Sequence, residues 1–167
     1  DKDFDAVLIA ARRYFLKLGK SDAAEEKVRQ LLAKSNISVK TKIIVAVIDK
    51  YVLTDDLLEL EKKVKKHKDV FYAIEGTNAI TLITAAKYGD DIKNLFKSSI
   101  AKIWIDLALT IISSPEEIEE TLGVLTYLSS LLSDKGINVL EFMSCWSETL
   151  FVVAEKDIAK VLEALKI

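Results

Sequence analysis

Apolar and polar residues alternate with a period of two along residues 37–47 and again along residues 103–111. Such alternation is typical of β-strands, because successive side chains point to opposite faces of a sheet. One face of the first strand is expected to carry a row of residues: Ile37, Val39, Thr41, Ile43, Val45 and Val47. The second stretch predicts one long strand that ends one structural unit and begins the next.

Residues 37–97 read in order as a strand, a helix, a two-stranded hairpin and a second helix. The first helix begins at Thr54, with acidic residues in its first turn and lysines in its last, as the helix dipole favours. The hairpin strands, 70–75 and 79–86, flank a Gly-Thr-Asn turn. A short helix from Asp90 is expected to bury three residues: Ile92, Leu95 and Phe96.

Residues 107–166 repeat this order of elements. The run Ser114-Pro115-Glu116-Glu117 is typical of a helix start with a capping box. The helix over residues 122–134 is expected to end at Gly136 and to bury five residues: Val124, Leu125, Leu128, Leu131 and Leu132. The strands 137–145 and 149–154 form a second hairpin. A last helix is expected to turn four residues inward: Ile158, Val161, Leu162 and Leu165.

Apolar stripes also predict two helices before the first repeat, over residues 3–18 and from Ser21 to Lys34. The chain opens at Asp1 inside a helical pattern, so we expect the natural N-terminus to lie upstream. The predicted fold class is α+β, with two ferredoxin-like β-α-β-β-α units that have antiparallel sheets and helices on one side. The expected division is a helical extension (1–35), a first unit (36–106) and a second unit (107–167).

The composition narrows the class of protein. The chain has 167 residues, of which 50% are hydrophobic and 30% are charged, which argues against a disordered or a membrane protein. Its net charge of −2 provides no general attraction to nucleic acid. The single cysteine, Cys145, excludes an intrachain disulfide and fits a reducing interior. We therefore expect a cytoplasmic protein that makes no contact with membranes.

The residues that carry chemistry are sparse. The one histidine, His67, lies in a lysine-rich stretch and is expected at the surface. The glutamates of residues 116–120 have no histidine or cysteine nearby to complete a metal site. Cys145 is expected to pack as a small hydrophobe or to lie near the hairpin bend, and Trp104 and Trp146 to fill core or subunit contacts. With no nucleophile–base pair, metal set or phosphate loop, the sequence predicts neither an enzyme nor a bound cofactor.

Four runs in the second repeat carry a family resemblance: Glu120 to Leu125, Lys135 to Val139, Met143 to Cys145, and Leu150 to Val153. They resemble the ACT domain, a small regulatory module that binds amino acids and controls metabolic enzymes. The chain is similar to tandem ACT pairs, such as the regulatory tails of aspartate kinases. It is also similar to free-standing archaeal proteins with a helical segment before two ACT units. It departs from the family in having Leu122 where a proline often precedes the glycine.

The resemblance, together with physical chemistry, predicts a ligand site in the second unit. Gly123 lacks a Cβ and stands at a helix start, where free amide groups attract a carboxylate. Asn138 offers both a donor and an acceptor. The candidate ligand-binding residues are Thr121, Leu122, Gly123, Val124, Asn138 and Val139. The resemblance implies a pocket shared with a neighbouring unit. The plainer alternative is that Gly123 is a tight helix entry and Asn138 a turn residue.

The leading hypothesis is a non-catalytic amino-acid sensor that regulates amino-acid metabolism by allostery. One alternative is a transcription regulator whose DNA-binding helices lie mostly upstream, because the first helical stripe carries Arg12 and Arg13. Another is a structural scaffold in which the ligand site has decayed, because Leu122 replaces the family's proline. Exposed edge strands favour association, so a homodimer or higher homo-oligomer is expected. Nucleic acid is not an expected partner of this chain alone.

Overall fold

The computed structural model of the chain describes residues 7, 24–52 and 54–166. Apart from Val7, the predicted helix over residues 3–18 lies outside the described residues, and so do Arg12 and Arg13. Residues 24–32 are helical and belong to the second predicted helix. No helix among the described residues is long and apolar enough to cross a membrane.

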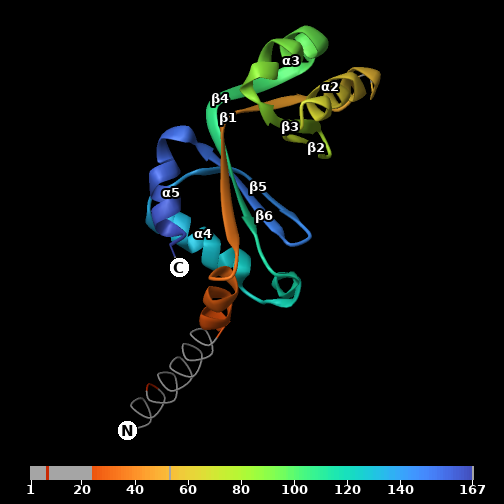
Figure 1. Cartoon of the computed structure of the whole chain (residues 1–167). Coiled ribbons are helices and arrows are strands. Elements are labelled where there is room, and N and C mark those ends of the chain that lie inside the picture. Colours follow the sequence, from red (N-terminus) through yellow and green to blue (C-terminus); the bar gives the residue numbers. More distant parts are fainter. Residues whose placement is uncertain (1–6, 8–23, 53, 167) are drawn as a thin grey trace.

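A six-stranded antiparallel sheet organises the molecule, in the order β2-β3-β1-β4-β6-β5 (Figure 1). Its two central strands, β1 (Asn36–Asp49) and β4 (Ile100–Ser113), have 14 residues each and run through both halves of the molecule. The single long strand that the sequence predicts is therefore confirmed as β4. The remaining strands are β2 (Phe71–Glu75), β3 (Ala79–Ala85), β5 (Val139–Cys145) and β6 (Glu148–Ala154).

The helices repeat in the two halves, as expected for an α+β protein with two ferredoxin-like units. The α-helices are α2 (Thr54–Lys66), α3 (Gly89–Phe96), α4 (Val124–Asp134) and α5 (Ile158–Ala164). The short 3-10 helices are η1 (Ala86–Tyr88), η2 (Lys97–Ser99), η3 (Glu116–Glu120) and η4 (Glu155–Asp157). Even the helix ends match, because α2 and α4 are each followed by a left-handed residue, Lys68 and Gly136.

Both central strands contain a β-bulge that the sequence pattern does not reveal. Lys42 in β1 and Asp106 in β4 adopt φ values of 54° and 57°, and the register shifts on either side of Ile43. An extra residue reverses which face the following side chains occupy. The predicted single row on β1 is therefore wrong, since Ile37 pairs with Ile112 on the helix-covered face. Ile43 and Val45 instead belong to a cluster on the opposite face.

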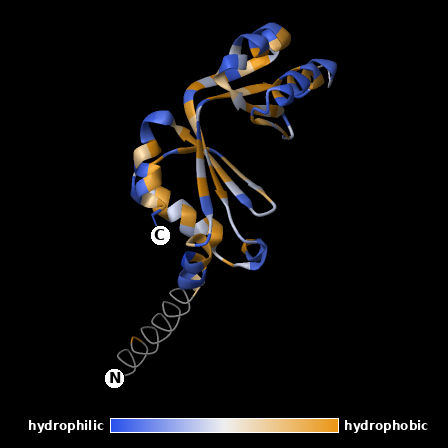
Figure 2. Ribbon diagram, viewed as in Figure 1, coloured by the Kyte–Doolittle hydropathy of each residue, from blue (hydrophilic) through white to orange (hydrophobic). Residues whose placement is uncertain are grey.

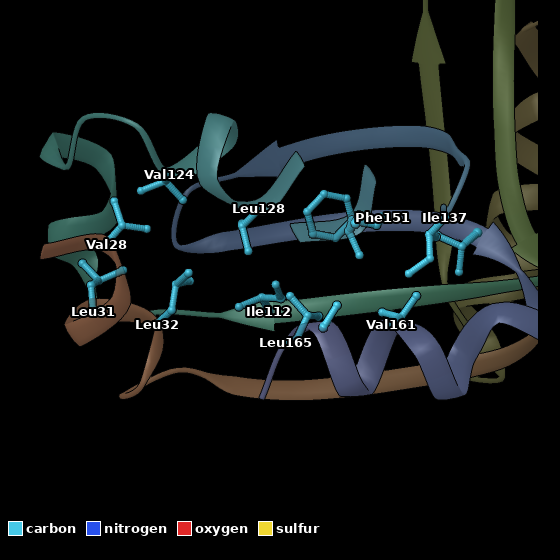
Figure 3. Packing of buried hydrophobic residues seen from close by; sticks show 13 residues of the cluster. Val28, Leu31, Leu32, Ile112, Val124, Leu128, Ile137, Phe151, Val161 and Leu165 are labelled. Carbon is cyan, nitrogen blue, oxygen red and sulfur yellow. The ribbon is translucent and has the colours of Figure 1, made fainter. Parts of the chain in front are cut away.

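Two helix-covered cores lie at the two ends of the sheet. In the first half, α2 and α3 pack on β1 and β3, with Leu60, Ile92 and Leu82 fully buried. In the second half, α4, α5 and residues 24–32 pack on β4 and β6, around Phe151 and Leu128 (Figure 3). Figure 2 shows hydrophobic positions concentrated along the strands and hydrophilic ones along the outer sides of the helices. Within the described residues, the helices thus cover one face of the sheet, as predicted.

The helix-free face of the sheet forms a third cluster, because the sheet bends at its bulged central strands. The cluster joins Ile43 and Val45 of β1 to Leu150 and Val152 of β6. Tyr72 of β2 packs against it, and burial, then the charges of Glu148 and Cys145, raise the pKa of Tyr72. In a flat sheet β2 and β6 would stand four strand spacings apart, about 19 Å. The bend therefore brings the two halves together across this face.

The strand pairing interleaves the two halves. The C-terminal part of β1 pairs with β3 and with the N-terminal part of β4, so the first half has four strands of its own. The second half uses β4, β5, β6 and a fourth strand, residues 36–40, which pair with residues 109–113. The closing strand of the second half thus comes from the start of β1, before the first half in the chain.

Candidate functional site

The connection from β4 to α4 builds the main site. After Ser113 the chain passes Pro115 and forms η3. Thr121, which follows η3, donates its hydroxyl hydrogen to the Glu117 carbonyl oxygen at 2.7 Å. The predicted capping box is wrong, because this segment is a 3-10 helix without a capping side chain. Proline at 115 and the back-bond from Thr121 favour such a tight turn over a full α-helix.

Gly123 turns the chain into α4. It has a φ of 89°, in the left-handed region that glycine adopts without strain, and no side chain caps the helix after it. The first-turn amides of α4, from Val124 onward, are therefore left without a side-chain partner at the positive end of the helix dipole. This is the arrangement that attracts a carboxylate.

A cleft of about 490 Å³ opens at this helix start. One wall is the connection itself, with Ile118, Glu119 and residues 121–123. The opposite wall comes from the β5–β6 hairpin, through the side chains of Phe142, Ser144, Trp146 and Thr149. The volume lies within the range of about 300–1,000 Å³ that is typical of small-molecule sites.

Register explains why the hairpin side chains reach the cleft. Ser144 pairs with Thr149, and Thr149 pairs with Ile112, whose side chain lies in the helix-covered core. Paired residues in an antiparallel sheet point to the same face. Phe142 lies two residues before Ser144 and stacks on Phe151, with ring centroids 5.1 Å apart. Trp146, in the turn between the strands, is 65% exposed.

Four of the six candidate ligand-binding residues line the cleft: Thr121, Leu122, Gly123 and Val124. The other two, Asn138 and Val139, follow the opposite end of α4 and do not line it. An 11-residue helix separates the two groups by about 16 Å within one chain. Asn138 is exposed, while Val139 is half-buried against the core of the second half.

Two expected core positions are exposed instead. Leu125 on α4 is 53% exposed and lines the cleft, and Leu162 on α5 is 40% exposed. The α4 residues that reach the core are Val124, Leu128 and Leu132, a spacing of four that leaves Leu125 on the adjoining face. Trp146 and Cys145 are exposed as well, with Cys145 at the hairpin bend.

A second cavity, of about 440 Å³, lies between the bulges of β1 and β4. Two of the charged residues that line it, Lys87 and Asp69, form an ion pair. Lys87 Nζ lies 2.7 Å from Asp69 Oδ2, and this contact, followed by the Tyr88 hydroxyl, lowers the pKa of Asp69. The Lys42 amide donates to Glu155 Oε2 at 3.1 Å. These contacts hold the connections around the bulges in place.

Among the residues that the structure describes, no group of three or more His, Cys, Asp or Glu side chains lies close enough together to hold a metal ion. His67 is exposed, as expected, and its Nδ1 lies 2.9 Å from the Lys63 carbonyl oxygen.

Solved structures share this architecture. The aspartate kinase of Clostridium acetobutylicum aligns over 78% of this chain with a TM-score of 0.63 and 18% identity, and this chain covers 33% of that enzyme. The regulatory subunit of aspartate kinase from Thermus thermophilus aligns over 77% of this chain and 92% of its own length, with a TM-score of 0.58 and 8% identity.

The chain shares the fold of aspartate kinase regulatory domains. A C-terminal regulatory domain from Porphyromonas gingivalis agrees, with a TM-score of 0.56 and 14% identity over 78% of this chain and 94% of its own. The resemblance to ACT domains is thereby confirmed for the fold. The sequence itself matches no protein-family model and no curated protein. This chain spans about a third of the complete kinase and nearly the whole of the separate regulatory pieces.

Sequence reasoning did not identify the hairpin side of the cleft. Phe142, Ser144, Trp146 and Thr149 come to the site only through the pairing of β5 with β6. One local signal was present. Ser144 and Thr149 are polar residues that pair with each other on the helix-covered face, where a sheet normally carries apolar side chains.

Proposed function

We propose that this chain is a non-catalytic regulatory protein of amino-acid metabolism that binds an amino acid and passes the binding signal to its assembly. The observation that carries the proposal is the cleft of about 490 Å³ at the uncapped start of α4. The shared fold supports a regulatory role, because the matched structures include regulatory subunits and domains of aspartate kinase.

The ligand's α-carboxylate is proposed to accept hydrogen bonds from the first-turn amides of α4, beginning at Val124. Gly123 presents no Cβ, and apart from its two neighbours in the chain no residue would lie within 4 Å of one added there. The backbone is therefore open to a close approach by the ligand. The α-ammonium group is then proposed to face the acidic η3 segment, where Glu119 lines the cleft.

The second half is the proposed sensing half. There the connection from Ser113 to Val124 is long enough to form η3 and one wall of the cleft. In the first half β1 ends at Asp49 and α2 begins at Thr54, so only a short turn joins them. The two halves thus share a fold but differ in this connection, which on this proposal builds the ligand site.

Asn138 and Val139 take part, on this proposal, from a second copy of the chain. Within one chain they lie beyond the far end of α4, so they can meet the cleft only across an interface between copies. The cleft also faces outward with large exposed apolar groups, Leu122 at 85% and Leu125 at 53%. A ligand held between copies changes how they pack, which is the physical basis of allosteric control.

The test is thermal unfolding of the chain with each of the twenty L-amino acids at millimolar concentration. A ligand at 100 times its dissociation constant stabilises the folded state by about 2.7 kcal/mol, so a true ligand raises the melting temperature clearly. The amide derivative of that amino acid, which lacks the carboxylate, is the matched control and should have little effect. A set of melting curves that none of the amino acids shifts contradicts the proposal.

A further inference from the structure

The lining of the cleft points to a ligand class: we infer that it selects an uncharged amino acid with a large apolar or aromatic side chain. This inference rests on the proposed function and sharpens it. The side chains around the cleft support it, whereas the start of α4 supports the proposed function.

Large apolar side chains line the cleft on both sides. Phe142 and Trp146 stand on the hairpin side, while Leu122 and Leu125 stand on the helix side. The ring of Phe142 packs at a tilt against the fully buried Phe151, and this contact favours one position of the ring in the wall. Aromatic walls favour an apolar or aromatic partner, through burial and through offset or edge-to-face ring contacts.

The lining disfavours amino acids with charged side chains. No lysine, arginine or histidine lines the cleft, so nothing there would neutralise the side chain of aspartate or glutamate. The nearby η3 segment adds further negative charge through Glu116, Glu117 and Glu120. Glu119 is the single carboxylate of the lining, and the ligand's ammonium group already requires it. Lysine and arginine would therefore place a second positive charge against an apolar wall.

A buried polar group marks the floor of the cleft independently of the helix start. Thr149 is only 4% exposed as a residue and lines the cleft. A threonine hydroxyl both donates and accepts hydrogen bonds, so Thr149 offers the polar groups of a ligand a partner at the cleft. Together with Thr121 and Ser144, it gives the ammonium and carboxylate groups of an amino acid polar partners beside the apolar side chains of the lining.

The experiment is calorimetric titration of the full chain with L-phenylalanine, L-leucine, L-methionine, L-alanine, L-aspartate and L-lysine. Burial of a large apolar side chain predicts about 10- to 100-fold tighter binding of the best large apolar amino acid than of alanine. Aspartate and lysine are expected to bind at least tenfold more weakly than that ligand. Tightest binding of alanine, aspartate or lysine overturns the inference and leaves the proposed function standing. No binding of any amino acid overturns both.

Variants distinguish a loss of binding through the cleft wall from a loss caused by general destabilisation of the fold. Trp146→Ala should weaken binding of the best apolar ligand by about tenfold, and Trp146→Phe should recover most of it. Ile74→Ala is the control, because Ile74 is an exposed apolar residue of the edge strand β2 in the other half and should leave binding unchanged. Equal binding by Trp146→Ala and the unaltered chain, or equal loss in Ile74→Ala, contradicts the assignment of the wall.

Discussion

At the scale of single residues, the conformation of Gly123 decides the geometry of the site. Its φ of 89° lets the chain enter α4 directly from η3 without a capping side chain. The leucine before it, where the resembled family often has proline, is almost fully exposed, at 85%. The left-handed turn at Gly123 and the cleft beside it are thus both present with leucine, not proline, at position 122.

Gly123→Ala should weaken amino-acid binding at least tenfold, because the added methyl group stands beside the amides that the carboxylate approaches. A left-handed alanine also costs stability, about 1–2 kcal/mol. Gly136→Ala is the matched control, since Gly136 has a φ of 66° and equally open surroundings at the far end of α4. Denaturant unfolding should show similar losses of stability for both variants, and calorimetry a loss of affinity for Gly123→Ala alone. Equal affinities would count against a role for Gly123.

At the scale of elements, the bulges in β1 and β4 explain both a success and a failure of sequence reasoning. Strand positions, hairpins and most helix starts followed from periodicity and turn residues, because these signals are local. The faces of β1 did not follow, because Lys42 reverses the alternation and lysine carries no local sign of a left-handed backbone. The hairpin wall of the cleft was missed for a related reason: Phe142 and Thr149 reach it only through strand register.

Lys42→Val should test the bulge directly. A β-branched residue at a φ of 54° is strained, and the expected loss of stability is about 1–3 kcal/mol. Lys40→Val, on the same strand outside the bulge, should change stability by only about 0.5 kcal/mol, because Lys40 is exposed. Urea unfolding compares the two variants. If Lys42→Val is as stable as Lys40→Val, the backbone at position 42 is not left-handed.

At the scale of the whole molecule, the second half depends on the first part of β1, residues 36–40, which lie before the rest of the first half in the chain. A division of the chain at residues 106 and 107 stays a prediction from the repeat pattern. Strand pairing adds that residues 36–40 complete the four-stranded sheet of the second half. Without them, residues 109–113 of β4, which include Ile112, would have no pairing strand on that side.

A fragment of residues 107–166 should therefore fail to fold cooperatively. Joining residues 35–41 to its C-terminus through a short glycine linker should restore a cooperative transition, because the added strand can pair with residues 109–113. Circular dichroism during thermal unfolding measures both. A scrambled seven-residue extension is the control. Cooperative unfolding of the unextended fragment would contradict the dependence on β1.

The most direct test of the account is to map where an amino acid binds. The full chain, labelled with ¹⁵N, is titrated with the amino acid that stabilises it most, and amide chemical shifts are followed. The account predicts saturable shifts that are largest at residues 121–125, with further shifts at residues 142–149 and little change in the turn between β1 and α2. Largest shifts elsewhere, for example around the bulges of β1 and β4, or no saturable shift with any amino acid, would contradict it.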